Sequence, residues 1–362
     1  LRRGMAAWKR KGGIEKFRED LVNGMLIKGY TMEFAQSIFR QMEGFGEYGF
    51  PESHAASFAL LAYQSAWLKC HEPEAFLAAL LNSQPMGFYS PSQLVQDAVR
   101  HAKVRVLPVD VQHSGWDASL VFDDAPRPAV RLGLNQVQGL HKDCAARIGE
   151  ARIQGHFQNL ADLARRAQLD RRALDALAAA DALVALSGHR RQARWDAAAT
   201  QVPTGLLRDT WVADAEVPDL PAPTEGQTIM EDYATTGLTL RRHPLALLRP
   251  ALARLRFETA ETLWDHPSKR LARACGIVTM RQRPQTAKGT VFVTIEDESG
   301  VINVIVRASL GERQRKELLG ATLLGVYGVW QNEQNVRHLL AERLTDLSHL
   351  LGELVPKSRD FH

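Results

Sequence analysis

The residues best suited to chemistry lie between Tyr48 and Ala55, where the sequence YGFPESHA runs into an apolar stretch typical of a helix. Pro51 has the fixed φ angle that suits a first helical turn, so Ser53 and His54 would stand beside backbone N–H groups that have no partner within the helix. Those groups and the helix dipole favour an anion such as a triphosphate. The alternative is that His54 caps or packs against the helix, and the spacing alone fits both readings.

Residues 46–63, GEYGFPESHAASFALLAY, followed by Trp67-Leu-Lys, resemble the fingers domain of bacterial C-family DNA polymerases. Residues 81–97 (LNSQPMGFYSPSQLVQD) and the ending 358–362 (SRDFH) resemble the error-prone, damage-tolerant branch of that family, and the resemblance runs almost from end to end. It implies that the incoming nucleotide is contacted in the fingers. The implied nucleotide contacts are Arg2 and Arg3 near the triphosphate, His54 on a phosphate, and Tyr48 and Gly49 against sugar and base. Fixed cations suit this role because charge develops on the pyrophosphate leaving group.

The resemblance also implies two divalent metal ions, Mg²⁺ in the parent polymerase, held by carboxylates of a palm domain that precedes the fingers. We find no Asp-x-Asp pair in strand-like sequence, and Asp123-Asp124 lies in a proline-flanked stretch. We therefore expect no catalytic or metal-binding residue in this chain, which alone should be inactive although its parent is a DNA-directed DNA polymerase. The start at Leu1 without an initiator Met fits a piece of a longer polypeptide.

The implied role of the parent is translesion synthesis and DNA repair. Its implied partners are primer–template DNA, the single-stranded template, a dNTP, and accessory mutagenesis proteins that link it to the sliding clamp. Two alternatives stay open. One is a non-catalytic module that binds single-stranded and duplex DNA. The other is a fragment of a replicative polymerase III alpha subunit, which we disfavour because the sequence ends about a dozen residues after the predicted OB-fold (269–350).

Composition sets the outer limits on these hypotheses. The 362 residues are 45% hydrophobic, enough for two or three domains, and 45 Lys and Arg against 41 Asp and Glu give a net charge of +4. Cys70, Cys144 and Cys275 are widely separated, which argues against a zinc site or a disulfide scaffold and favours the cytoplasm. No segment has the length and apolarity of a membrane helix or the pattern of a signal peptide, so we expect no membrane partner.

The predicted fold class is multidomain α+β, with all-α fingers and a tandem helix-hairpin-helix region followed by a five-stranded OB-fold barrel. Helical spacing predicts helices over 14–28, 32–42, 52–70 and 74–82, with Gly29 as a left-handed cap. Residues 227–230 match a clamp-binding peptide only poorly. The expected segments are helical fingers (1–110), tandem helix-hairpin-helix (111–200), proline-rich linker (201–235), helical connector (236–268), OB-fold (269–350) and tail (351–362).

In the helix-hairpin-helix region, residues 132–142 and 144–152 read as helix, glycine hairpin and helix. Gly139 would let a phosphate approach the backbone, and N–H groups of the next helix would bind it without reading sequence. His141 stands where such hairpins usually have a second glycine, so His141 and Lys142 are expected to reach phosphate by side chain. A second unit, residues 169–183 and 188–194, adds Arg190 and Arg191 as candidate DNA contacts.

The last part alternates in the manner of β-strands over 274–280, 291–296, 301–306, 323–330 and 336–341, with a hairpin at 297–300 and a helix over 310–319. Five strands with a helix after the third is the order of an OB-fold, which binds single-stranded nucleic acid by stacking and charge. Candidate contacts are Arg281, Arg283 and Lys288. Phe292, Tyr327 and Trp330 are either stacking platforms or core residues, and alternation does not decide which.

Overall fold

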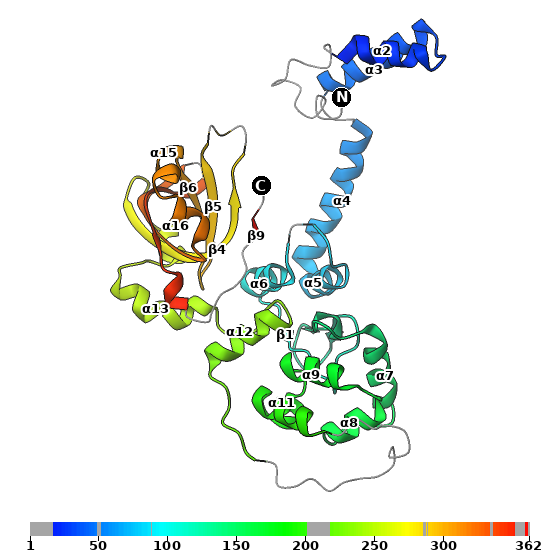
Figure 1. Ribbon diagram of the computed structural model, residues 1–362, viewed down its shortest axis with the longest axis vertical. Coiled ribbons are helices and arrows are strands. Elements are labelled where there is room, and N and C mark those ends of the chain that lie inside the picture. The colour runs from blue at the N-terminus through cyan, green and yellow to red at the C-terminus, as the bar shows by residue number, and fades with distance from the viewer. Residues whose placement is uncertain are drawn as a thin grey trace. The chain divides into compact units, whose positions relative to one another are not determined.

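The computed structural model describes residues 17–48, 52–87, 89–200, 218–284, 287, 289–333, 336–351 and 359–360; for 43–48, 52–54 and 359–360 it describes the backbone alone. The chain divides into two compact units, residues 1–73 and residues 74–362, and each is described by itself (Figure 1). The second unit contains both a helical part and a β-barrel. The first unit ends well before the boundary near residue 110 that we predicted.

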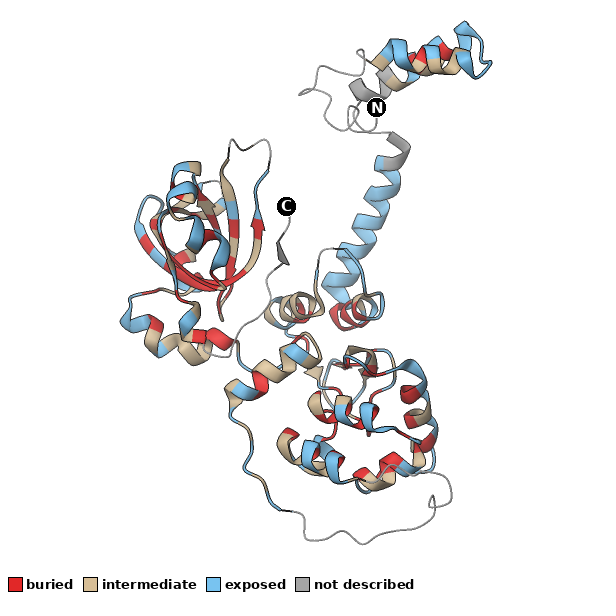
Figure 2. Cartoon of the chain, in the orientation of Figure 1, coloured by how far each residue is buried: buried red, intermediate tan, exposed pale blue. Residues whose placement is uncertain are grey.

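Among its described residues, the first unit contains three helices: α2 (Arg18–Ile27), α3 (Met32–Tyr48) and α4 (Glu52–His71). Gly29 follows α2 with φ +85°, which confirms the predicted left-handed cap. Val22, Ala35 and Phe39 are the buried residues where α2 and α3 pack together. Figure 2 shows α4 as an exposed helix in the part whose side chains are described.

The second unit begins with α5 (Pro73–Asn82) and α6 (Pro91–Ala102). Leu77 and Leu81 of α5 and Val95 of α6 belong to the same hydrophobic core as the helix-hairpin-helix residues. This shared core is the physical reason why the structure divides near residue 73. Sequence reasoning missed α6, although Ser90 forms a capping box with Gln93 at its start, a pattern that is readable in the sequence.

In the described ranges 103–200 and 218–235, a short three-stranded sheet and seven helical segments complete the helical part. In the sheet, β3 pairs in parallel with β1 and antiparallel with β2. The elements are β1 (Val106–Leu107), β2 (Ser119–Val121), β3 (Ala129–Arg131), the 3-10 helix η2 (Leu134–Gln136), α7 (Lys142–Arg152), α8 (Leu160–Arg166), α9 (Arg171–Ala179), α10 (Val184–Ser187), α11 (Arg190–Ala199) and α12 (Glu225–Thr235).

Helix α12 occupies the end of the segment predicted as a linker. Thr224 and Gln227 form a capping box at its start, and Ile229 is fully buried. A helix forms in this part of the predicted linker because it buries an apolar side chain and because the capping box supplies hydrogen-bond partners for its first backbone N–H groups. Burial of Ile229 also leaves the 227–230 segment poorly placed to act as a clamp-binding peptide.

The barrel is preceded by α13 (Pro244–Arg254) and α14 (Ala260–Trp264). Its elements are β4 (Leu271–Gln282), β5 (Val291–Glu296), β6 (Val301–Val306), α15 (Ala308–Arg313), α16 (Arg315–Gly320), β7 (Leu323–Glu333), β8 (Val336–Asp346), η5 (Ser348–Leu351) and β9 (Arg359–Asp360). The strand order is β5-β6-β8-β7-β4, and pairing of β4 with β5 closes the barrel. All five predicted strands and the helical segment after the third are confirmed, and so is the predicted fold class.

Two details fix the barrel's register. The predicted hairpin closes with a hydrogen bond from the Asp297 N–H to the Gly300 carbonyl. A β-bulge lies between Tyr327 and Gly328, and a Cβ at Gly328 would lie 2.1 Å from the Leu340 carbonyl oxygen. Glycine is therefore required there by space, because β7 and β8 approach too closely for any side chain at that point.

Candidate nucleic-acid interface

The first hairpin is exposed and is built around Gly139. Its φ is +82°, a conformation that costs other residues energy, whereas a Cβ would meet no atom within 4 Å. The glycine is thus needed for its backbone angle, and the space above it is open. The Gln138 N–H donates to the Thr235 carbonyl at 2.9 Å, so the end of α12 holds the hairpin backbone in place.

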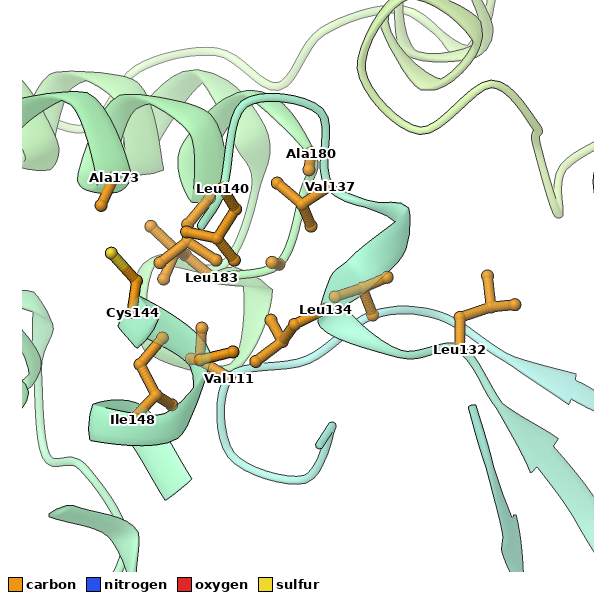
Figure 3. Packing of buried hydrophobic residues seen from close by; sticks show 14 of the residues in the cluster. Val111, Leu132, Leu134, Val137, Leu140, Cys144, Ile148, Ala173, Ala180 and Leu183 are labelled. Carbon is orange, nitrogen blue, oxygen red and sulfur yellow. The ribbon is translucent and has the colours of Figure 1, made fainter. Parts of the chain in front are cut away.

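A buried cluster supports this hairpin from below. Leu140 turns inward from the loop and lies beside Leu183, which follows α9, in the buried cluster that also contains Ile148 of α7 (Figure 3). Leu134 and Val137 anchor the preceding turn in the same cluster. Because these side chains fill the interior, the exposed face of the hairpin is left to backbone and polar groups.

Helix α7 starts directly after the hairpin, with His141 as its N-cap. The His141 side chain makes no capping hydrogen bond, and both His141 and Lys142 are exposed. First-turn N–H groups with no side-chain acceptor, next to a lysine, form a site where a phosphate oxygen can bind. Asp143 is also exposed in the first turn and adds a negative charge, so the positive charge that favours a phosphate here comes from Lys142.

The corresponding end of α11 is covered by the chain itself. Nδ1 of His189 accepts a hydrogen bond from the Gln192 N–H at 3.1 Å, so Nε2 carries the proton and donates to the Leu220 carbonyl at 2.9 Å. Arg191 donates to the Pro221 carbonyl at 2.8 Å. Residues 218–223 therefore occupy the place where a phosphate would bind, and no pattern in the sequence indicated this contact.

Arg190 was predicted to contact DNA, and the structure corrects this. Its side chain is 1% exposed, donates to the Thr228 carbonyl at 2.9 Å and pairs with Asp232 and Glu231 of α12. Asp181 lies 3.9 Å away. The two terminal nitrogens of Arg190 thus tie α11 to α12, because a buried guanidinium is stable only with nearby acceptors and counter-charges, whereas its Nε has no hydrogen-bond partner. Arg191, half-buried on segment 218–223, is likewise occupied by protein partners.

Arg281 is corrected for a similar reason. It is 7% exposed and donates from Nε to the Leu318 carbonyl at 2.7 Å and from a terminal nitrogen to the Ala321 carbonyl. These carbonyls end α16, where a cation is favourable. Arg283, two residues later, is exposed and stays a candidate contact, whereas Lys288 lies outside the described residues.

The three barrel aromatics separate by burial. Trp330 is 1% exposed in the barrel interior, Tyr327 is half-buried on the outer surface, and Phe292 is 39% exposed. Val293 next to Phe292 faces the core, which settles the alternation that sequence left open. Phe292 is therefore available for stacking and Trp330 is not, whereas the Tyr327 ring is already covered by Arg273, Arg343 and Phe257.

The predicted nucleotide contacts lie largely outside the described residues. This applies to Arg2, Arg3 and Gly49, whereas Tyr48 ends α3 and His54 lies in the first turn of α4, both without a described side chain. In the described part, no three of His, Cys, Asp and Glu gather as metal ligands, so those residues do not fit a two-metal centre. None of the described helices is long and apolar enough to span a membrane.

A polar junction that sequence reasoning missed joins α6 to the barrel within the second unit. Arg100 of α6 donates to Glu296 Oε1 and to the Asp297 carbonyl, each at 3.3 Å. His243 Nε2 lies 4.0 Å from the same carboxylate oxygen. Burial, together with nearby Arg100, lowers the pKa of His243 to about 4, and burial raises the pKa of Glu296 and of Tyr233, the latter to about 12. The junction therefore holds His243 neutral near pH 7.

Comparison with known proteins places this geometry in a family. Residues 103–193 match the helix-hairpin-helix motif family, and residues 272–347 match the OB-fold nucleic acid binding domain family. The whole chain is 66% identical to an error-prone DNA polymerase of Bordetella parapertussis and covers 35% of it. The chain is homologous to part of the error-prone DNA polymerases.

The same relationship holds across further error-prone DNA polymerases. All of this chain aligns at 59% identity with that of Burkholderia pseudomallei, covering 34% of it, and at 54% identity with that of Methylococcus capsulatus, covering 36%. The chain thus spans about a third of the length of these relatives. The family resemblance that we read from the sequence, the error-prone branch included, is confirmed.

Proposed function

We propose that this chain is the part of an error-prone DNA-directed DNA polymerase that holds primer–template DNA and the incoming dNTP during translesion synthesis and DNA repair. The observation that carries the proposal is that the whole of this chain is similar to about a third of the length of error-prone DNA polymerases. The exposed Gly139 hairpin and the OB barrel supply DNA-binding surfaces, and Arg2, Arg3, Tyr48, Gly49 and His54 are the proposed dNTP contacts. The parent works in the cytoplasm with accessory proteins that link it to the clamp.

On this proposal the chemistry needs Mg²⁺ and carboxylates from another part of the parent. The role of this chain is positioning. Lys142, His141 and the first-turn N–H groups of α7 hold a duplex phosphate, and Arg283 and Lys288 hold a phosphate near the barrel. None of these contacts reads base identity, which suits an enzyme that must copy any sequence.

Binding of labelled primed duplex, measured over 50–200 mM salt, tests the DNA contacts. Lys142→Ala should lower the magnitude of the slope of log K against log salt by about 0.9, the value for one duplex phosphate. Arg172→Ala is the matched control, because Arg172 is an exposed arginine on α9 that we do not place at the interface. An unchanged slope for Lys142→Ala would remove the first hairpin from the proposed interface.

The second candidate function, a non-catalytic DNA-binding module, is favoured by the matches to the helix-hairpin-helix and OB-fold nucleic acid binding families. A correct dNTP added to the primed complex distinguishes the two. Tighter DNA binding with the complementary dNTP, and not with the other three, is expected for working fingers. Equal binding with all four would favour the module, and primer extension by this chain alone would contradict the proposed division of labour.

A further inference from the structure

Three residues on neighbouring strands form a cationic row on the outside of the barrel. Arg273 of β4 is paired directly with Tyr327 of β7, which is paired with Arg343 of β8. Both guanidinium groups lie over the tyrosine ring, at 5.2 and 5.4 Å from its centroid. Phe257 contacts the same ring edge-on at 5.4 Å and is itself buried. The ring is therefore fixed, and it holds two arginines in a defined place.

Both arginines are exposed and unneutralised. Within the described ranges, neither Arg273 nor Arg343 forms an ion pair or a side-chain hydrogen bond, whereas many other arginines of this unit have a carboxylate partner. Two acidic residues lie close by along the backbone: Glu342 is exposed and adjacent to Arg343 in sequence, and the Glu258 N–H donates to the Arg273 carbonyl. Two stacked guanidinium groups without an acceptor are suited to bind phosphate oxygens.

A row of apolar side chains lies beside the cationic row, two or three residues away along the same strands. The strand register pairs Leu271 with Val329, Val329 with Leu340, Leu340 with Ile305, and Ile305 with Phe292. The row thus crosses all five strands on the outer surface. Its two ends are the most exposed, with Leu271 at 73% and Phe292 at 39%. Four strand-to-strand steps of about 4.8 Å make the row about 19 Å long.

We propose that these two rows bind an unpaired DNA strand, with phosphates on Arg273 and Arg343 and bases on Leu271, Val329 and Leu340. Duplex DNA presents only its backbone to such a surface and would leave the apolar row wet, whereas an unpaired strand brings both groups at once. The path lies over β4, β7 and β8 and continues through Ile305 to Phe292, near Arg283. The inference rests on the proposed DNA-binding function and assigns the strand's course over the barrel.

Titration of labelled dT12 over 50–200 mM salt tests the proposal. Each single-strand phosphate contact contributes about 0.7 to the salt slope, so Arg273→Ala with Arg343→Ala should reduce its magnitude by about 1.4 and weaken binding about 25-fold at 0.1 M salt. Leu271→Ser should weaken binding with the slope unchanged, because it removes an uncharged contact. Far-UV circular dichroism and a melting curve verify that each variant is folded.

The matched control is Arg313→Ala with Lys316→Ala, which removes two exposed charges from α15 and α16 of the same barrel and should alter the slope much less. Equal losses in both double variants would show a net-charge effect and overturn the proposal. An unchanged affinity and slope in the Arg273/Arg343 variant would also overturn it and leave this face to a protein partner. If the parent chain binds no DNA, the proposed function and this inference fail together; binding with an unaffected variant sinks the inference alone.

Discussion

Replacing Arg190 tests the distinction between a structural and a DNA-binding arginine. Arg190→Met keeps the length of the side chain but removes the charge that Asp232, Glu231 and the Thr228 carbonyl share. Loss of one partner from a buried ion pair costs about 3–5 kcal/mol, because the remaining carboxylates stay desolvated without a counter-charge. The folding constant should therefore fall about 10²- to 10⁴-fold.

Urea unfolding followed by far-UV circular dichroism measures this loss, with Arg172→Ala as an exposed control that should change stability by less than about 0.5 kcal/mol. Adding Asp232→Asn to Arg190→Met should recover part of the loss, since it removes one orphaned charge. Under conditions where Arg190→Met stays folded, the slope of log K against log salt for its DNA binding should equal that of the unsubstituted chain. A stable variant with a shallower slope would refute the reasoning and return Arg190 to the DNA interface.

Acid should destabilise the chain through His243, whose pKa is about 4 in the folded state. As pH falls from 6.5 to 4, only the unfolded chain gains this proton, so the free energy of unfolding should decrease by about 3 kcal/mol. Glu296 has a raised pKa and therefore stabilises the folded state as pH falls, in the wild-type chain and in His243→Asn alike. Urea unfolding at pH 7 and pH 4 should therefore show a smaller acid-induced loss of stability in His243→Asn than in the wild-type chain. Equal losses would contradict the lowered pKa of His243. Glu74→Gln should cost about 1.5 kcal/mol in thermal or urea unfolding, because buried Glu74 accepts two hydrogen bonds from Arg127, at 2.7 and 2.8 Å. Glu225→Gln, which removes the exposed ion pair with Arg242, should cost less, because solvent screens a surface pair. Gly328→Ala should cost about 3 kcal/mol by overpacking against β8, whereas Gly320→Ala, which meets no atom within 4 Å, should be near neutral by the same measurement.

The barrel was predictable because its information is local. Each strand alternates between core and surface, as Val293 and Phe292 illustrate, and the turn residues between strands are explicit. The α2 end was predictable for the same reason, since Gly29 is a signal that needs no tertiary context. Which aromatic faces outward was not predictable, because that depends on the phase of the alternation relative to the core.

The misassigned arginines show where sequence reasoning stops. Arg190 and Arg281 read as surface cations, and only the fold reveals that Asp232 and the carbonyls at the end of α16 surround them. The same holds for the Arg273 and Arg343 pair, whose members are 70 positions apart in the chain and meet at Tyr327 through strand register alone. Long-range pairing therefore both removes candidates from the interface and adds them.

The short connection between α12 and α13 has a consequence for how this chain grips a substrate. Helix α12 is tied to α11 by Arg190 and to the Gly139 hairpin through Thr235. Residues 236–243 lead from α12 into α13, which shares a buried cluster with β4 of the barrel, so the two proposed DNA-binding surfaces are closely linked. A strand released from one surface stays at high effective concentration near the other. On the proposed function, two linked DNA-binding surfaces would lengthen the residence time on DNA and would let the parent polymerase pause at a damaged base without dissociating.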